Sequence, residues 1–327
     1  MSNTQKSWSF HENQVVSIAR EAGVAIMDEL SNPNHLKVDS KDDDSPVTSA
    51  DKRANDIILS KLGEGDLNVQ SPRGTKLTYY PILSEEMTLE QQQAIMKKGT
   101  YWCVDPLDGT KTAIKYAGGE KNQTQFGVLI SLVKNGVPVF GVAHYPAEGK
   151  ADANGKPVGV TYFTSANGKT AYRQEGDEPR QRIRANKITE GPMTMAAGYR
   201  GASPAHIAGR AVHNQPSVGG SRILRAAEGK VHVGYMGNDG PISFGYWDLA
   251  APQAILKAAG GELVTMLGGF AEHQVDGALK ESKPIRYDGS SFIPGMEGQP
   301  YLPACLAAHK DTLRALGMQA ISRQVGE

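Results

Sequence analysis

Apolar residues recur at helical spacing along two stretches near the start of the chain. Between residues 11 and 30, one helix face collects Val15, Ile18, Ala19, Ala22, Ala25, Ile26 and Leu30. This spacing predicts an amphipathic helix. A second helix is predicted to begin at Thr48 or Ser49, either of which can cap it, and to stop at Gly63. Its apolar side contains Ala54, Ile57, Ile58 and Leu62.

Short apolar runs bounded by turn residues predict strands in the next part of the chain. Residues 79–86 (YYPILSEE) and 101–106 (YWCVDP) are the first two such runs. Residues 126–146 predict a β-hairpin with Lys134-Asn135-Gly136 at its turn, and residues 160–176 repeat the pattern around Asn167-Gly168. These hairpins predict an antiparallel sheet.

The pattern changes after about residue 180. Residues 223–236 and 246–266 each place a helical stretch before a strand-like one. Such alternation is typical of an α/β layer rather than of further hairpins. We therefore expect stacked helix and sheet layers, with an N-terminal α+β domain over residues 1–180 that binds metal and a C-terminal α/β domain over residues 181–327 that recognises substrate. The active site is expected in the cleft between them.

Charge and cysteine content narrow the function classes. Lys+Arg and Asp+Glu each number 35, so net charge favours neither nucleic acid nor an anionic membrane as a partner. Cys103 and Cys305 form no metal-binding pattern, and reduced thiols in the cytoplasm fit them best. The chain starts without a secretory apolar segment, and its longest apolar run is far shorter than a membrane span.

Acidic residues stand at the ends of several predicted elements: Asp51, Glu85, Asp105, Asp108 and Asp248. Carboxylate oxygens are the ligands that Mg²⁺ prefers, and the lack of a His or Cys cluster argues against zinc or copper. Each acidic residue taken alone also fits a structural role, as a helix cap, a strand end or a turn. The functional interpretation depends on all of them occurring together.

The turn at residues 105–111 (DPLDGTK) can serve a cation and an anion at once. Pro106 fixes the chain as it leaves the strand, and Gly109 permits close backbone approach. The turn can aim both carboxylates at one cation, or at two cations about 3.5–4 Å apart. If Gly109, Thr110 and Lys111 open a helix, their N–H groups point at an anion such as phosphate.

Four strings together resemble the inositol monophosphatase superfamily of Mg²⁺-dependent, lithium-sensitive phosphatases. They are TSAD (48–51), LSEE (83–86), DPLDGT (105–110) and WDLA (247–250). PILSEE (81–86) and Lys111 are similar to the 3′(2′),5′-bisphosphate nucleotidase branch, and the segment before Trp247 lacks the Glu that inositol enzymes carry there. The resemblance implies an αβαβα sandwich of the sugar-phosphatase type, hydrolase activity, and a monomer or homodimer.

The resemblance also implies roles for individual residues. Glu85, Asp105 and the Leu107 carbonyl would bind a first Mg²⁺, and Asp105, Asp108 and Asp248 a second. Thr110 and Asp51 would orient the attacking water and take its proton, and Asp51 is also a candidate contact for a third, weaker metal. Gly109, Thr110, Gly220 and Ser221 would contact the phosphate or the rest of the substrate. Lys111, Arg200 and Arg222 are candidates to meet a second phosphate, the alternative for each being a surface cation.

The implied reaction is removal of the 3′-phosphate from adenosine 3′,5′-bisphosphate or its sulfated relative. Inositol or sugar phosphates are the alternative substrates of the same chemistry. A non-catalytic homologue that binds metal or phosphate is the alternative of a different class. In either catalytic case the partner is a small phosphorylated molecule rather than nucleic acid or a membrane.

Overall fold

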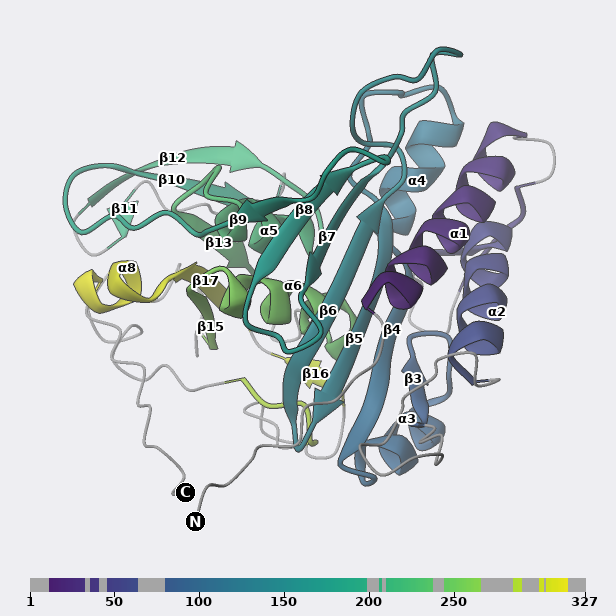
Figure 1. Ribbon diagram of the computed structural model, residues 1–327, viewed down its shortest axis with the longest axis horizontal. Helices are drawn as coiled ribbons and strands as arrows, with labels where there is room; N and C mark the ends of the chain where they lie inside the picture. The colour runs from purple at the N-terminus through teal and green to yellow at the C-terminus, as the bar shows by residue number, and fades with distance from the viewer. Residues whose placement is uncertain are drawn as a thin grey trace.

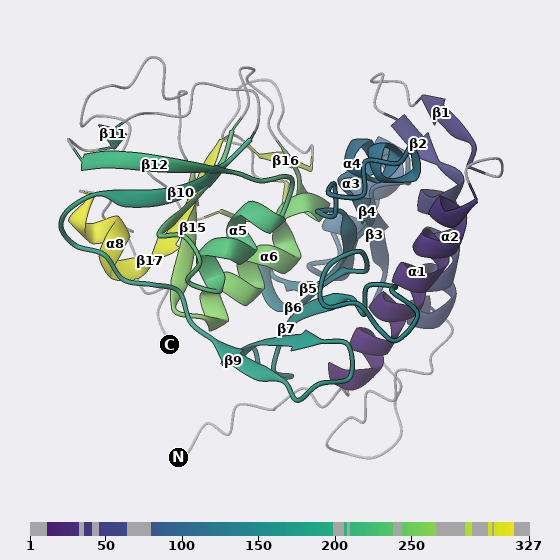
Figure 2. The same cartoon turned by 90° about the horizontal axis from the view of Figure 1, so that it is seen from above.

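The computed structural model describes residues 12–32, 36–40, 46–63, 80–198, 206–207, 210–237, 244–265, 285–289, 300–302 and 304–316. Its elements form five layers, helix–sheet–helix–sheet–helix (Figures 1 and 2). The predicted layered sandwich is thereby confirmed, with a largely antiparallel first sheet and a mixed second sheet.

The outer helices of the first half are the two that the sequence predicts. α1 spans Glu12–Ser31 and α2 spans Ser49–Gly63, and the pair covers one face of the first sheet (Figure 1). The Thr48 hydroxyl accepts from the backbone N–H groups of Ala50 and Asp51, so Thr48 is the cap of α2. A small antiparallel pair, β1 (Val38–Ser40) and β2 (Pro46–Thr48), connects these helices.

The first sheet has seven strands in chain order, of which only β3 and β4 are parallel. They are β3 (Ile82–Ser84), β4 (Thr100–Asp108), β5 (Gly127–Lys134), β6 (Val137–Tyr145), β7 (Val160–Thr164), β8 (Ala171–Glu175) and β9 (Gln181–Ile183), with α3 (Leu89–Met96) and α4 (Thr110–Ala117) between them. The β5–β6 hairpin is confirmed, because Asn135 and Gly136 both take positive φ at its turn.

The second sheet has strand order β11-β12-β10-β13-β17-β15. Its strands are β10 (Met193–Ala197), β11 (His206–Ile207), β12 (Arg210–Pro216), β13 (Val233–Met236), β15 (Gly261–Thr265) and β17 (Cys305–His309). α8 (Lys310–Ala315) packs on its outer face, and β14 (Phe244–Gly245) pairs with β16 (Tyr301–Leu302).

Two short helices fill the space between the sheets, α5 (Ser221–Ala227) and α6 (Tyr246–Ala258) (Figure 2). A methyl group on Gly141 of β6 would lie 2.5 Å from the carbonyl oxygen of Ala251 in α6. The absence of a side chain at Gly141 therefore lets α6 lie close against the first sheet. α6 belongs to the predicted C-terminal domain, yet it packs on the first sheet and so connects the two predicted domains. The predicted domain boundary at residue 180 stays a prediction.

Alternating residues of β4 divide the core into separate clusters. Tyr101 and Cys103 face α5, α6 and the second sheet, whereas Trp102 and Val104 face α1 and α2. All four are buried, as expected for a strand covered by helices on both faces. Cys103 and Cys305 are both free and buried, in accord with the expectation of reduced thiols.

Gly23 makes a testable contribution to the packing of α1. A methyl group there would lie 2.5 Å from Cδ2 of the buried His144 ring. Gly23→Ala should therefore destabilise the protein by about 1–3 kcal/mol, although Ala is normally better than Gly inside a helix by about 1 kcal/mol. Chemical denaturation measures the difference.

Gly63→Ala is the matched control for this substitution. No atom lies within 4 Å of the position where its methyl group would stand, at the end of α2. Its free energy of unfolding should stay within about 0.5 kcal/mol of the original. Equal stability of the two variants would contradict the proposed steric contact.

Candidate active site

The centre of the site is the end of β4, which continues past the predicted strand through Asp108. The pairing of β4 with β5 shifts between Asp105, opposite Leu129, and Asp108, opposite Gly127. Pro106 and Leu107 of β4 thus oppose the single residue Val128 of β5, which is a β-bulge. Residues three apart in a regular strand point to opposite faces, so the extra residue is what allows both carboxylates to point to one side.

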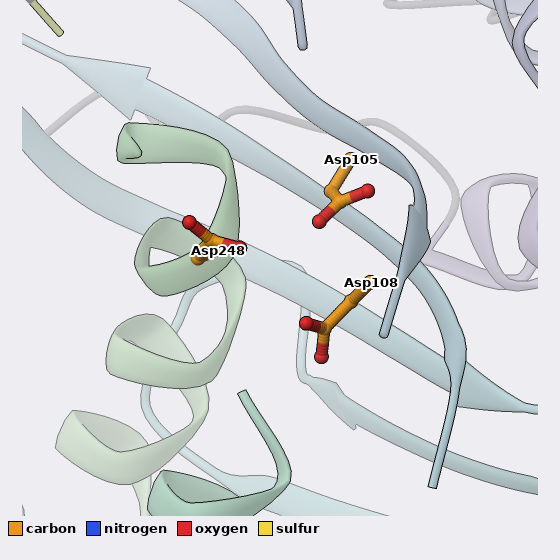
Figure 3. Close-up of side chains that lie close together, drawn as sticks. All are labelled: Asp105, Asp108 and Asp248. Carbon is orange, nitrogen blue, oxygen red and sulfur yellow. The ribbon is translucent and has the colours of Figure 1, made fainter. Parts of the chain in front are cut away.

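Asp248 completes the cluster from the first turn of α6. One carboxylate oxygen from each of Asp105, Asp108 and Asp248 lies within 4.8 Å of the other two (Figure 3). The Leu107 N–H donates to Asp105 Oδ1 at 2.9 Å, and the Gly245 N–H donates to Asp248 Oδ2 at 2.7 Å. Gly245 is therefore the N-cap residue of α6. Asp248 lies in the first turn, and its side chain accepts a hydrogen bond from the Gly245 N–H.

Burial and mutual repulsion make ionisation of these carboxyl groups unfavourable. Burial, followed by the nearby Glu85, Asp108 and Asp248, raises the pKa of Asp105 well above its usual range. Burial also raises the pKa of Asp108 to about 6, although the Gly220 N–H and the Arg222 charge act in the opposite direction. A divalent cation among the oxygens would remove this penalty, and a donor set made of oxygens fits Mg²⁺.

Asp51 and Thr110 meet beside this cluster, as the resemblance implies. Asp51 Oδ2 accepts from the Thr48 N–H at 2.8 Å, and the Thr110 hydroxyl lies 3.0 Å from Asp51 Oδ1 and 3.1 Å from the Leu107 carbonyl oxygen. Burial raises the pKa of Asp51 to about 6. The hydrogen bonds from Thr48 and Thr110 lower this pKa, and the nearby charge of Glu85 raises it further. A carboxyl group with this pKa can accept a proton near neutral pH.

Glu85 lies close to both groups, since its charge contributes to the raised pKa of Asp51 and of Asp105. Its N–H donates to the Val104 carbonyl at 3.1 Å, which continues the pairing of β3 with β4. The buried Gln92 side chain donates to the Ser84 carbonyl at 3.0 Å and holds this strand end in place. The structure therefore brings all five predicted acidic residues into one region.

The predicted substrate loop around Gly220 and Ser221 contacts a predicted metal ligand. The Gly220 N–H donates to Asp108 Oδ2 at 2.9 Å. Gly219 has φ of +47°, and a methyl group there would lie 2.0 Å from Asp108 Oδ1. Gly219 is therefore needed for the loop to approach this carboxylate so closely, whereas a methyl group on Gly220 would lie 2.8 Å from Cγ of Pro252 in α6.

The predicted cations lie in different settings. Arg222 is buried rather than on the surface, and its Nε donates to the Ser217 carbonyl at 3.1 Å. Lys111 is exposed in the first turn of α4, next to Gly109, whose φ is +82°. Arg200 lies outside the described residues.

Sequence reasoning missed three supporting residues: Gln92, Gln125 and Tyr145. The Tyr145 hydroxyl lies 3.5 Å from Asp108 Oδ2, and Gln125 contacts the 217–221 loop. Tyr145 ends an apolar strand, and both glutamines lie in ordinary polar contexts. Nothing in the sequence pattern distinguishes them from residues without a partner in the site.

Comparison with known proteins gives consistent results. A profile of the inositol monophosphatase family matches residues 9–288. The 3′(2′),5′-bisphosphate nucleotidase CysQ of Escherichia coli is 31% identical over 255 residues, covering 77% of this chain and 89% of that protein. Its counterpart in Salmonella typhimurium is 32% identical over 254 residues, covering 76% and 88%.

A solved structure extends the similarity to three dimensions. The crystal structure of CysQ from Bacteroides thetaiotaomicron, described as a bacterial member of the inositol monophosphatase family, aligns with a TM-score of 0.61 and 25% identity. It covers 91% of this chain and 97% of that one. Within the described part of the chain, no helix has the length and apolar character needed to cross a bilayer.

Binding of Mg²⁺ should release protons from the carboxylate cluster. At pH 6 the metal-free protein keeps part of its protons on the ligand carboxyl groups, because burial raises the pKa of Asp108 to about 6 and that of Asp105 well above its usual range. Ligation requires the ionised forms, so on the order of one to two protons should leave per protein at pH 6 and fewer at pH 8. Mg²⁺ affinity should therefore rise with pH.

Calorimetric titration with Mg²⁺ in buffers of different ionisation enthalpy measures the proton release. Asp105→Asn should reduce it. Release that is equal at pH 6 and pH 8 would show that these carboxyl groups are not the ones that bind the ion.

Proposed function

The chain belongs to the inositol monophosphatase family, and on this basis we propose that it removes the 3′-phosphate from adenosine 3′,5′-bisphosphate. The family is one of phosphatases, so hydrolysis of a small phosphomonoester is the established part of this statement. The choice of nucleotide is supported by the named activity of the Escherichia coli relative and by Lys111 after the DPLDGT string.

The observation that carries the catalytic proposal is the meeting of Asp105, Asp108 and Asp248 within 4.8 Å of one another. Together with Glu85 and the Leu107 carbonyl, these groups would hold two Mg²⁺ ions. When bound, Mg²⁺ would lower the pKa of a water molecule and neutralise charge on the phosphoryl oxygens.

The chain's own residues would supply the remaining steps. Asp51, oriented by Thr48 and hydrogen-bonded to Thr110, would take the proton of the attacking water. The N–H groups of Gly109 and Thr110 at the start of α4 would donate to the phosphoryl oxygens. Attack in line with the leaving oxygen requires no covalent intermediate on the protein.

Inositol or sugar phosphates are the second candidate substrates, favoured by the match of the family profile to residues 9–288. We also propose a cytoplasmic location, supported by the two free, buried cysteines. The presence of all the predicted acidic residues, together with the Thr110 hydroxyl beside Asp51, argues against a homologue that binds metal without turnover.

Asp105→Asn tests the metal assignment directly. The substitution removes a buried charge and a ligand oxygen while keeping the side-chain shape. Hydrolysis should fall by about 10³-fold or more, and Mg²⁺ should lose its ability to raise the unfolding temperature. The unfolding temperature in a chelator should be unchanged or higher, because repulsion within the cluster is reduced.

Asp177→Asn is the control, since the Asp177 carboxylate pairs with Arg20 at the exposed surface. It should retain normal activity and a normal response to Mg²⁺. Full activity of the Asp105 variant would contradict the assignment of this residue.

A substrate panel tests the choice of nucleotide. At equal Mg²⁺, kcat/KM for adenosine 3′,5′-bisphosphate should exceed that for inositol 1-phosphate by at least about tenfold, a difference of about 1.4 kcal/mol in transition-state binding. Phosphate release measures both rates. A nucleotide rate no higher than the inositol rate would favour the second candidate.

A further inference from the structure

One oxygen atom organises the loop that supports Asp108. Gln125 Oε1 lies 2.8 Å from the Val218 backbone nitrogen, 3.0 Å from Ser217 Oγ and 3.1 Å from Ser221 Oγ. Because a backbone N–H can only donate, the atom facing it must be the carboxamide oxygen rather than the NH₂ group. The orientation of the Gln125 side chain is therefore fixed by its partners.

The same residue contacts the other loop of the site through its backbone. A methyl group on Gly109 would lie 2.8 Å from the Gln125 carbonyl oxygen. Gly109 belongs to the turn that carries Asp105 and Asp108, whereas Ser217, Val218 and Ser221 belong to the loop on the far side of the cluster. Gln125 thus spans two loops that are about a hundred residues apart in the chain.

Gly220 connects the loop that Gln125 holds to the carboxylate cluster. Val218 and Ser221 flank this residue, and its N–H donates to Asp108 Oδ2 at 2.9 Å. Asp108 is buried, so a misplaced Gly220 N–H would leave Oδ2 with only the longer 3.5 Å contact to the Tyr145 hydroxyl. Residues that hold a ligand through such contacts typically contribute 10–100-fold to metal affinity or activity.

We infer that Gln125 is a positioning residue, which sets the 217–221 loop so that the Gly220 N–H fixes the Asp108 carboxylate for Mg²⁺ binding. This inference rests on the proposed function. It assigns Ser217 and Ser221 a supporting role, because their hydroxyl groups lie 2.7 Å apart and bind within the loop.

A neighbouring cavity explains why replacement of Gln125 should affect Mg²⁺ binding more than the stability of the fold. Gln125, Ser221 and Tyr145 are among the residues that line a cavity of about 140 Å³. If the carboxamide is removed, water in this space can accept from the serine hydroxyls. Stability is then largely preserved, whereas the position of the loop is not.

Gln125→Met and Gln125→Glu distinguish the role of the hydrogen-bond acceptor at this position from the role of the side-chain shape. Methionine has a similar length but no strong acceptor, so Mg²⁺ affinity by calorimetry and kcat/KM should each fall by about tenfold or more. Glutamate keeps an oxygen for the Val218 N–H and the Ser217 hydroxyl and should keep Mg²⁺ affinity within about threefold of the original. Unfolding temperatures in a chelator should stay close to that of the original protein for both.

Gln174→Met is the matched control, because Gln174 lies on β8 and its side chain donates to the Glu178 carbonyl beyond the end of that strand. It should leave Mg²⁺ affinity unchanged. Unaltered Mg²⁺ affinity and activity in Gln125→Met would overturn the inference while the phosphatase proposal stands, as would equal losses in the Met and Glu variants. Absence of Mg²⁺-dependent hydrolysis by the unsubstituted protein would instead overturn the proposed function.

Discussion

Electrostatic repulsion among buried carboxylates is the constraint around which this site is built. Asp105 and Asp108 are almost fully buried, and Asp248 brings a third acidic group within 4.8 Å. Such an arrangement lowers stability unless hydrogen bonds or a cation compensate for it. The fold supplies backbone N–H groups from Leu107, Gly220 and Gly245 to hold the oxygens in position. A divalent ion bound among the oxygens would supply the remaining compensation.

The layered architecture holds this cluster together because its members come from elements that pack on one another. The bulge in β4 turns two carboxylates to one side, and α6 carries the third against the same sheet. Gly141 sets the distance between α6 and the first sheet, since any larger residue would push the helix outward. The helix layer between the sheets therefore positions Asp248 in the acidic cluster as well as forming part of the core.

The sequence predicts the helices, the hairpins and the acidic residues well because each leaves a local signal. The face of α1, the Asn135-Gly136 turn and the strings around Asp105 and Asp248 all consist of neighbouring residues. The bulge leaves no such signal, since it is visible only in the pairing of β4 with β5. Nor do the contacts of Gln125 and Gly220, whose partners lie 92–96 and 112 positions away in the chain. An amide or a glycine has the same local pattern whether or not such a partner exists.

The distance in sequence between Asp108 and Gly220 has a consequence for biosynthesis. A ribosome makes the strands of the first sheet well before it makes the loop and helix that contribute Gly220 and Asp248. Domains generally fold as they emerge, so the early acidic residues are exposed to cellular cations before their partners exist. The nascent chain at that stage lacks Gly220 and Asp248, so the acidic cluster is complete only after the 217–221 loop and α6 have been made.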